Sequence, residues 1–183
     1  LGTTASNTTI DLGGGADRLV LLDSNTNMLT VAGAETVMGG SFTDRITVIG
    51  LTPALIRGEG GNDTLVGGDG ADTLVGGVGR DLMTGGAGAD RFVFTNAVES
   101  SVTTPDTITD FQVGTDKLVF AGLLTNSFTW RGAGTFTGAG NTEARLSGQT
   151  VQLDFDGNGV AEGAVFLSSS SPISLSGIDL VWI

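Results

Sequence analysis

Residues 58–93 read GEGGNDTLV, GGDGADTLV, GGVGRDLMT and GGAGADRFV, four consecutive nonapeptides of the form G-G-x-G-x-D-x-U-x, in which U is apolar. The first copy departs from this form only at Glu59. The sixth position is an aspartate in every copy: Asp63, Asp72, Asp81 and Asp90. Four copies in one phase are hard to obtain by chance, and a fixed short period is typical of solenoid folds.

Each nonapeptide divides into a turn and a short strand. The six residues G-G-x-G-x-D must turn, because glycine permits positive φ and close backbone approach. In x-U-x the middle side chain points to one side and its neighbours point to the other. Turns and strands then alternate in a flattened right-handed coil of about 18 residues, and coils stack at the ~4.8 Å strand spacing. We therefore expect an all-β fold, a parallel β-roll, whose thin core holds the middle residues Leu19, Val37, Ile46, Leu65, Leu74, Met83 and Phe92.

Weaker copies of the repeat lie upstream. LGGGADRLV (12–20) and GGSFTDRIT (39–47) place Asp17 and Asp44 at the sixth position, three whole repeats apart. The segment VIGLTPALIR (48–57) has lost its acid and gained one residue, which indicates a bulge near its proline. Glycine is missing from several turn positions of these copies, so their capacity to bind metal stays open.

Three regions follow from this pattern: degenerate coils in 1–57, a regular roll in 58–93 and a C-terminal cap in 94–183. In the cap, short apolar segments alternate with turns. We expect antiparallel strands there that cover the open end of the roll, at FTW (128–130), VQLDF (151–155), GAVFL (163–167) and IDLVWI (178–183).

The placement of acidic residues indicates a cation. The 183 residues include 20 Asp or Glu and 8 Lys or Arg, a formal net charge of −12. Stacked coils bring the sixth-position aspartates into register every ~5 Å, and such a ladder of like charges opposes folding. Oxygen ligands from these carboxylates and from turn carbonyls suit Ca²⁺ better than Mg²⁺, which demands a smaller and stricter octahedron. The alternative, that each aspartate only bonds its own turn, does not explain an acid at one phase in every clear copy.

Composition also excludes several function classes. Cys and His are absent, which removes disulfides, zinc-protease sites and His-dependent nucleophiles. The serine run 168–171 has no neighbouring His or Lys to activate it. The acidic balance disfavours nucleic acid, and no apolar run reaches the ~20 residues of a membrane span. We therefore expect no catalytic centre in this chain.

The four nonapeptides resemble those of the RTX (repeats-in-toxin) family, which carries a Ca²⁺-binding parallel β-roll. The resemblance implies carbonyl ligands from the second and fourth positions of one turn, from the first and third positions of the turn two repeats on, and from both aspartates. One implied site takes Glu59, Gly61 and Asp63 with Gly76, Val78 and Asp81. The next takes Gly68, Gly70 and Asp72 with Gly85, Ala87 and Asp90. An earlier site takes Gly40, Phe42 and Asp44 with Gly58, Gly60 and Asp63, although Phe42 departs from the pattern. The other candidate turn residues are Gly67, Asp69, Gly77 and Gly79.

The resemblance continues past the repeats. ADRFVFTNAVESSVTTPDTITDFQVGTDKLVF (89–120) resembles the segment after the roll in serralysin-type metalloproteases and other RTX exoproteins. Asp106 and Asp110 either close the last calcium site or serve as a turn residue and a backbone cap. DFDGNGVAE (154–162) matches the first half of an EF-hand loop but has Val165 at the twelfth position, so a hairpin turn competes with a Ca²⁺ site there.

The chain ends in Asp179 followed by LVWI, which resembles the uncleaved type I secretion signal of serralysin-like proteins. A last strand of the cap is an equally good interpretation. The N-terminal residues LGTTASNTT (1–9) have neither the basic start nor the apolar stretch of a secretory signal, as expected within a larger protein. The resemblance thus implies a Gram-negative exoprotein, exported by a type I ABC transporter to the medium or the cell surface.

The expected function is a Ca²⁺-binding C-terminal module with several ions, which folds after secretion and stabilises or anchors an extracellular protein. The degenerate repeats in 1–57 favour a surface protein, such as an S-layer protein or adhesin. The alternative is the non-catalytic C-terminal domain of a serralysin-like metalloprotease or another exoenzyme. Self-association and a cell-surface ligand stay open.

Overall fold

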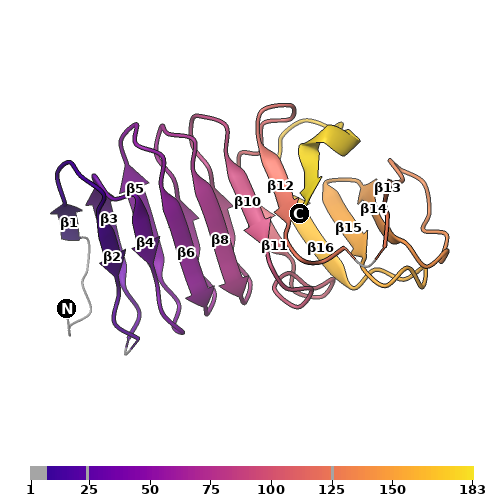
Figure 1. Cartoon of the computed structure of the whole chain (residues 1–183), viewed down its shortest axis with the longest axis horizontal. Helices are drawn as coiled ribbons and strands as arrows, with labels where there is room; N and C mark the ends of the chain where they lie inside the picture. Colours follow the sequence, from indigo (N-terminus) through magenta and orange to yellow (C-terminus); the bar gives the residue numbers. More distant parts are fainter. Residues whose placement is uncertain (1–7, 24, 125) are drawn as a thin grey trace.

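Two sheets share the strands of the roll in alternation (Figure 1). The structure is a computed structural model that describes residues 8–23, 25–124 and 126–183; the first seven residues of the N-terminal segment lie outside it. One sheet contains β1 (Thr8–Asp11), β3 (Met28–Ala32), β5 (Arg45–Ile49), β7 (Thr64–Val66), β9 (Leu82–Thr84) and β11 (Asp106–Ile108). The other contains β2 (Arg18–Val20), β4 (Thr36–Met38), β6 (Leu55–Gly60), β8 (Thr73–Val78), β10 (Arg91–Phe94) and β12 (Lys117–Phe120).

Every pairing among these strands is parallel and joins a repeat to the one two repeats on. In one sheet Leu65 stands opposite Met83, and in the other Ile56 stands opposite Leu74. The all-β parallel roll expected from the nonapeptide is therefore confirmed.

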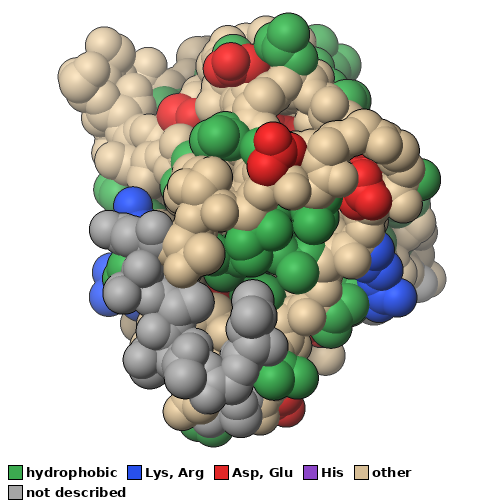
Figure 2. Space-filling view, turned by 90° about the vertical axis from the view of Figure 1, so that its left-hand side faces the viewer, with side chains coloured by type: hydrophobic (Ala, Val, Ile, Leu, Met, Phe, Trp, Pro, Cys, Tyr) green, Lys and Arg blue, Asp and Glu red, His purple; other side chains and the backbone are tan. Residues whose placement is uncertain are grey.

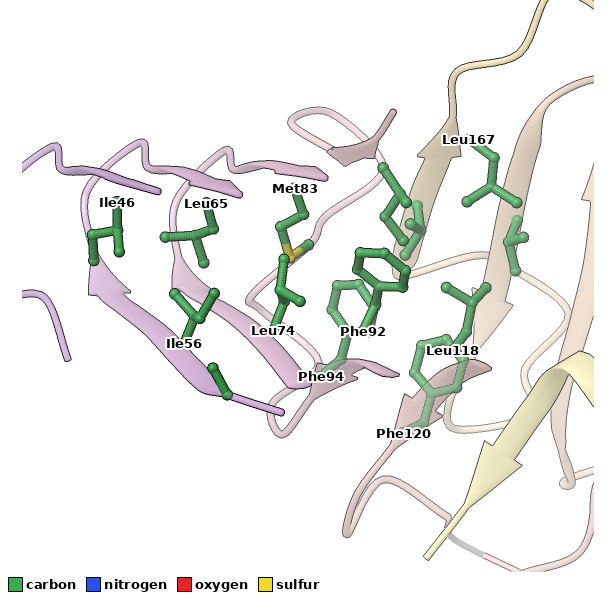
Figure 3. Packing of buried hydrophobic residues seen from close by; sticks show 14 of the residues in the cluster. Ile46, Ile56, Leu65, Leu74, Met83, Phe92, Phe94, Leu118, Phe120 and Leu167 are labelled. Atoms are coloured by element: carbon green, nitrogen blue, oxygen red, sulfur yellow. The ribbon is translucent and has the colours of Figure 1, made fainter. Parts of the chain in front are cut away.

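The core is the thin layer between the two sheets, and the middle residues of the repeats fill it (Figure 3). Side chains from β5, β7 and β9 meet those from β6, β8 and β10 in two facing rows. Of the expected middle residues, only Leu19, in the N-terminal coil, keeps part of its surface exposed. The fully buried ones are Val37, Ile46, Leu65, Leu74, Met83 and Phe92.

The irregular segment 48–57 keeps the stacking although it lacks the acid. Ala54 stands where the aspartate is missing, and its amide donates to Asp72 Oδ1 at 2.8 Å. Ile56 then takes the buried middle position between Val37 and Leu74. The surplus residue is absorbed in the exposed turn, where the side chain of Leu51 is 78% exposed.

The cap completes both sheets. Its elements are β13 (Phe128–Trp130), β14 (Thr142–Ser147), β15 (Thr150–Asp154), β16 (Gly163–Leu167), a 3₁₀ turn η1 (Gly177–Asp179) and β17 (Leu180–Trp182). The expected antiparallel pairing holds for β15 and β16, and β15 also pairs antiparallel with β14, a strand that was not predicted. It is wrong for β13, which pairs in parallel with β14. In addition, β16 joins β11 and β17 joins β12 in parallel, because these two strands extend the sheets of the roll. Within the described ranges no helix is long and apolar enough to cross a membrane.

Candidate metal sites in the stacked turns

The repeat aspartates form two hydrogen-bonded ladders, one along each edge of the roll. On one edge, Asp63 Oδ1 accepts the amide of Asp44, Asp81 Oδ1 accepts the amide of Asp63, and Asp106 Oδ1 accepts the amide of Asp81, each at 2.8 Å. Each acid thus satisfies the backbone N–H of the acid that precedes it in the stack. The other edge repeats this arrangement with Ala54, Asp72, Asp90 and Asp116.

The second carboxylate oxygen in these ladders is often left without a partner. Among the described residues, Oδ2 of Asp17, in the degenerate N-terminal coil, is buried and accepts no hydrogen bond. The same is true of Oδ2 in Asp63, Asp81, Asp90 and Asp106. These four side chains are at most 2% exposed. A buried carboxylate oxygen without a partner is costly, so native structures rarely leave one without an ion or water to satisfy it. A cation with oxygen ligands fits this donor set.

Burial also changes the protonation equilibrium of these carboxyls. It raises the pKa of Asp63 to about 7 and the pKa of Asp106 to about 8. In the same way it raises the pKa values of Asp81 and Asp90 to about 6. Neighbouring carboxylates of the stack raise these pKa values further, because like charges oppose a second ionisation. Near neutral pH the turns therefore favour any species that brings positive charge, either a proton or a metal ion.

The predicted carbonyl ligands face the turn that is stacked two repeats on. A Cβ atom on Gly77 would overlap the carbonyl oxygen of Glu59, and one on Gly79 would overlap that of Gly61. The next pair of turns shows the same contacts, from Gly86 to the oxygen of Gly68 and from Gly88 to that of Gly70. The structure thus brings the second- and fourth-position carbonyls against the following turn in both implied sites.

First-position glycines leave room for the orphaned carboxylate oxygens. A Cβ atom on Gly58, Gly76 or Gly85 would overlap Oδ2 of the aspartate in its own turn. On Gly67 it would lie 2.5 Å from Asp72 Oδ2, which is not orphaned but accepts the amide of Gly68 at 2.8 Å. The lack of a side chain at this position is therefore required by the carboxylate beside it.

Some of the predicted carbonyl ligands already accept a backbone hydrogen bond. The carbonyl of Val78 already accepts the amide of Gly61 at 3.0 Å, and the carbonyl of Gly68 accepts that of Ala87 at 3.1 Å. A carbonyl oxygen has a second lone pair, so both remain available to a metal. The side chain of Asp69 is exposed, away from the buried carboxylate oxygens.

Glu59 has a backbone conformation that favours glycine. Its φ is +75°, in the left-handed region that costs a residue with a Cβ about 1 kcal/mol or more. Its carboxylate pairs with Arg57, with 2.7 Å between Oε1 and Nε. The carbonyl of Glu59 nevertheless faces the next turn, as the glycine's would.

The earlier implied site, at Asp44, differs in the hydrogen bonds that its carboxylate accepts. Asp44 Oδ1 accepts both the amide and the side-chain nitrogen of Asn27, and Asp44 Oδ2 accepts the amide of Gly40. The carbonyl of Gly40 accepts the amide of Gly60 at 3.0 Å, and Phe42 is 47% exposed. Hydrogen bonds alone therefore satisfy the acid of this turn, as they do for Asp72, whose Oδ1 accepts the amide of Ala54 and whose Oδ2 accepts that of Gly68. Asp63, Asp81, Asp90 and Asp106 differ, because each keeps an orphaned oxygen.

The acids after the repeats take different positions. Asp106 continues one ladder, whereas Asp110 accepts the amides of Gly85 at 2.9 Å and Gly86 at 2.8 Å and so caps the last regular turn. Sequence reasoning missed Asp116, which continues the other ladder by accepting the amide of Asp90 at 3.0 Å. Its signal was present: DKLV (116–119) repeats the Asp-x-apolar-x ending of the nonapeptide.

The EF-hand-like loop is a hairpin connection between β15 and β16. Carboxylate oxygens of Asp154, Asp156 and Glu162 lie within 4.8 Å of one another. However, Asp154 Oδ1 accepts the amide of Gly157 at 2.7 Å, and Asp154 Oδ2 accepts that of Gly159 at 2.8 Å. The buried acid of this loop thus serves the turn itself, unlike the orphaned oxygens of the roll.

Comparison with known proteins agrees with this geometry. A family model described as Peptidase M10 serralysin C terminal matches residues 12–156. The solution structure of the AlgE6R3 subunit from the Azotobacter vinelandii mannuronan C5-epimerase is similar at 30% identity and a TM-score of 0.51, over 78% of this chain and 80% of that one. No curated protein matches significantly. These findings support a calcium-binding, RTX-like module that corresponds to the non-catalytic C-terminal part of serralysin-type proteins. The chain belongs to the serralysin C-terminal family.

Proposed function

We propose that this chain is a module that folds when Ca²⁺ binds between its stacked turns. The observation that carries the proposal is the set of buried aspartate oxygens without a hydrogen-bond partner, on Asp63, Asp81, Asp90 and Asp106. A Ca²⁺ ion between two turns would be coordinated by these oxygens and by the facing carbonyls, and its charge would offset the negative charge of the stacked aspartates. Because the ion binds the folded state and not the unfolded state, its binding free energy adds to the free energy of folding.

Two calcium sites have the strongest support. One joins the turns that begin at Gly58 and Gly76, and the other joins those that begin at Gly67 and Gly85. A further site at Asp81 and Asp106 is favoured by the two orphaned oxygens there. The Asp44 site has weaker support. Hydrogen bonds satisfy its carboxylate, as they do that of Asp72, and in addition Phe42 stands where the repeat has glycine.

Calcium-dependent folding would couple the module to export. In cytosol with little Ca²⁺ the ladder repels itself, so the chain stays unfolded enough to pass a type I ABC transporter. Outside the cell, abundant Ca²⁺ would fold the roll, which then stabilises or anchors the protein that contains it. The extracellular destination fits a family of secreted proteins.

Between the two candidate parents, the family match favours an exoenzyme of the serralysin type. The degenerate coils before residue 58 favour a surface protein with a longer roll, such as an S-layer protein or adhesin. A His-Glu-x-x-His helix upstream of the module in the gene would identify a metalloprotease, and further β repeats a surface protein.

A calcium titration followed by far-UV circular dichroism tests the folding proposal. We expect a weak strand signal in metal-free buffer and a cooperative gain as Ca²⁺ is added, with Mg²⁺ at equal concentration much less effective. An equal strand signal with chelator and with Ca²⁺ would show that the acid ladder needs no metal, and the proposal would fail.

A further inference from the structure

The last strand, β17, is an edge strand, and among the described residues its one partner is β12. The amide of Gly122 donates to the carbonyl of Ile183 at 2.7 Å. The ring of Trp182 packs against Phe120 and Phe128, with 4.6 Å between ring centroids in both pairs. The indole Nε1 is buried without a hydrogen-bond partner among the described residues. Such an N–H lowers the gain in free energy from docking the strand, because it gives up its hydrogen bond to water.

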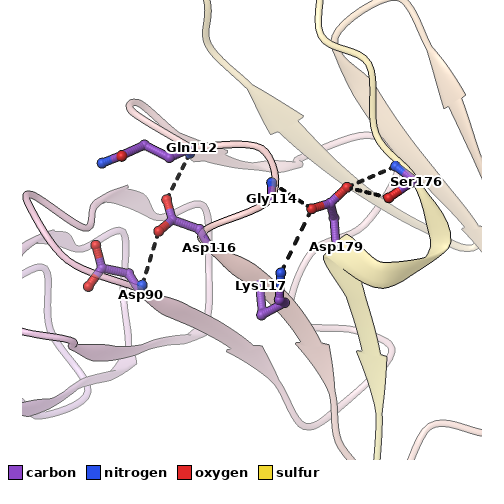
Figure 4. A network of polar contacts seen from close by, with 7 residues as sticks. All are labelled: Asp90, Gln112, Gly114, Asp116, Lys117, Ser176 and Asp179. Atoms are coloured by element: carbon purple, nitrogen blue, oxygen red, sulfur yellow. Dashed lines mark hydrogen bonds and ion pairs between the residues drawn. The ribbon is translucent and has the colours of Figure 1, made fainter.

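Asp179 holds β17 in place from the preceding 3₁₀ turn (Figure 4). Its carboxylate is fully buried and accepts the amide of Gly114 at 2.8 Å, and the amide and hydroxyl of Ser176 at 2.8 and 3.0 Å. The ammonium of Lys117 lies 3.9 Å away. Burial acts to raise the pKa of Asp179, but these bonds outweigh it and hold the pKa below its ordinary value. The charged form therefore makes the contact.

The loop that Asp179 grips is itself held by the roll. Asp116, which is 1% exposed, accepts the amide of Gln112 at 2.8 Å through Oδ2 and the amide of Asp90 at 3.0 Å through Oδ1. Residues 112–116 thus lie between the last regular turn and the last strand (Figure 4). Asp90, at the roll end of this chain of contacts, is one of the acids with an orphaned buried oxygen.

We propose that calcium in the last regular turns and the docking of β17 promote each other, through Asp116 and Asp179 as positioning residues. The inference rests on the proposed calcium function of Asp90. A cation there fixes the turn whose amide Asp116 accepts, which orders loop 112–116 and presents the amide of Gly114 to Asp179. Coupling between sites is reciprocal, so a docked β17 raises the calcium affinity of that turn by the same factor. Leu180, Val181 and Trp182 are at least partly buried in the calcium-bound chain and exposed in the calcium-free chain.

The test uses Trp182 as a reporter, in a Trp130→Phe background that leaves it the only tryptophan. During a Ca²⁺ titration, circular dichroism follows the roll and tryptophan emission follows the docking of β17. In the background chain we expect both signals to change over the same Ca²⁺ range, with the emission moving to shorter wavelength. In Asp179→Asn we expect the strand signal to rise at a Ca²⁺ midpoint at least about 5-fold higher, while the emission stays at long wavelength. Asp11→Asn, an exposed acid at the other end of the roll, is the matched control.

Three results would overturn the inference. The first is a Trp182 emission already at short wavelength without calcium. The others are an Asp179→Asn chain with the same Ca²⁺ midpoint as the background chain, and one with the same Trp182 emission as the background chain. If Asp179→Asn does not fold at any Ca²⁺ concentration, a chain that ends at Asp179 decides. Its Ca²⁺ midpoint rises if the coupling exists and stays unchanged if it does not. Failure of the proposed function is distinct, because the background chain would then show no strand response to calcium.

Discussion

At the scale of single residues, Asp63 shows how one carboxylate serves two purposes. Its Oδ1 accepts the amide of Asp44, which the oxygen of a neutral amide side chain would also do, whereas its buried Oδ2 has no hydrogen-bond partner among the described residues. Asp63→Asn therefore keeps the backbone contact and removes the charge. We expect the Ca²⁺ midpoint of folding to rise about tenfold or more, because ligand charge sets calcium affinity. Circular dichroism measures it, with Asp11→Asn unchanged; equal midpoints in the two variants would argue against Asp63 as a ligand.

Glu59 allows a prediction about backbone strain. Both Glu59→Gly and Glu59→Ala remove the half-buried ion pair with Arg57, so its contribution is the same in the two variants. Only glycine relieves the left-handed backbone at φ +75°. We expect the glycine variant to be more stable than the alanine variant by about 1 kcal/mol in free energy of unfolding at saturating Ca²⁺, measured by urea denaturation. Equal stabilities would mean that the turn relaxes at this position.

The turn is the next scale, and its first glycine is its most constrained residue. In Gly76→Ala the new Cβ would overlap Asp81 Oδ2, so turn or carboxylate must shift. We expect a loss of about 1–3 kcal/mol in free energy of unfolding, together with a higher Ca²⁺ midpoint. Gly14→Ala is the matched control, because no atom lies within 4 Å of its added Cβ and its stability should hold or rise slightly. A tolerated Gly76→Ala would contradict the close packing of this turn.

The stacked turns of one edge also predict a pH dependence for the calcium-free chain. Burial raises the pKa values of Asp63 to about 7 and of Asp106 to about 8, from an ordinary value of 3.8. At a pH between the ordinary value and these raised values, the two carboxyls thus hold protons in the folded chain that they have released in the unfolded chain. This stabilisation is complete below about pH 4 and is lost as pH rises through the folded pKa values, roughly 6 to 8. In metal-free buffer we expect the strand signal to increase from about pH 8 to about pH 5. Asp106→Asn should weaken the dependence near its upper end; an unaltered pH profile in that variant would contradict this assignment.

The strands and turns show how much of the fold could be predicted from the sequence. The nonapeptide period predicted strands, stacking and core, because glycine turns and one apolar position per repeat are local requirements. The left-handed φ of Glu59 was missed, since a glutamate gives no sign of the conformation that its neighbours impose. The strand β14 was missed because TEARLS carries the buried Glu143, whose carboxylate is satisfied by Thr137 in a loop that only folding brings near.

At the scale of the whole molecule, the two ends of the roll differ. The C-terminal end is covered by β13 to β17, while β1 and β2 each pair with one strand among the described residues. Hydrophobic side chains gather at the centre of the N-terminal face (Figure 2), where Leu19, Leu21 and Ile10 line a small pocket. In a stacked repeat each coil gains stability mainly from its neighbours, so a coil with one neighbour opens more easily.

Hydrogen exchange at saturating Ca²⁺ should therefore reveal a gradient along the roll. We expect the amides of β8 and β10, which have neighbours on both sides and turns with orphaned carboxylates, to exchange most slowly. The amides of β1 and β2 should exchange fastest in this chain, because each of these strands has one neighbour among the described strands and Asp17 beside β2 belongs to a degenerate coil. Mass spectrometry of peptic fragments resolves these regions. Lowering Ca²⁺ toward the folding midpoint should extend the fast exchange from β1 toward β5, since loss of an ion loosens the coils on either side of it. Uniform protection from β1 to β12 would instead mean that the roll opens as one unit, with stability set by the cap and not by the coils.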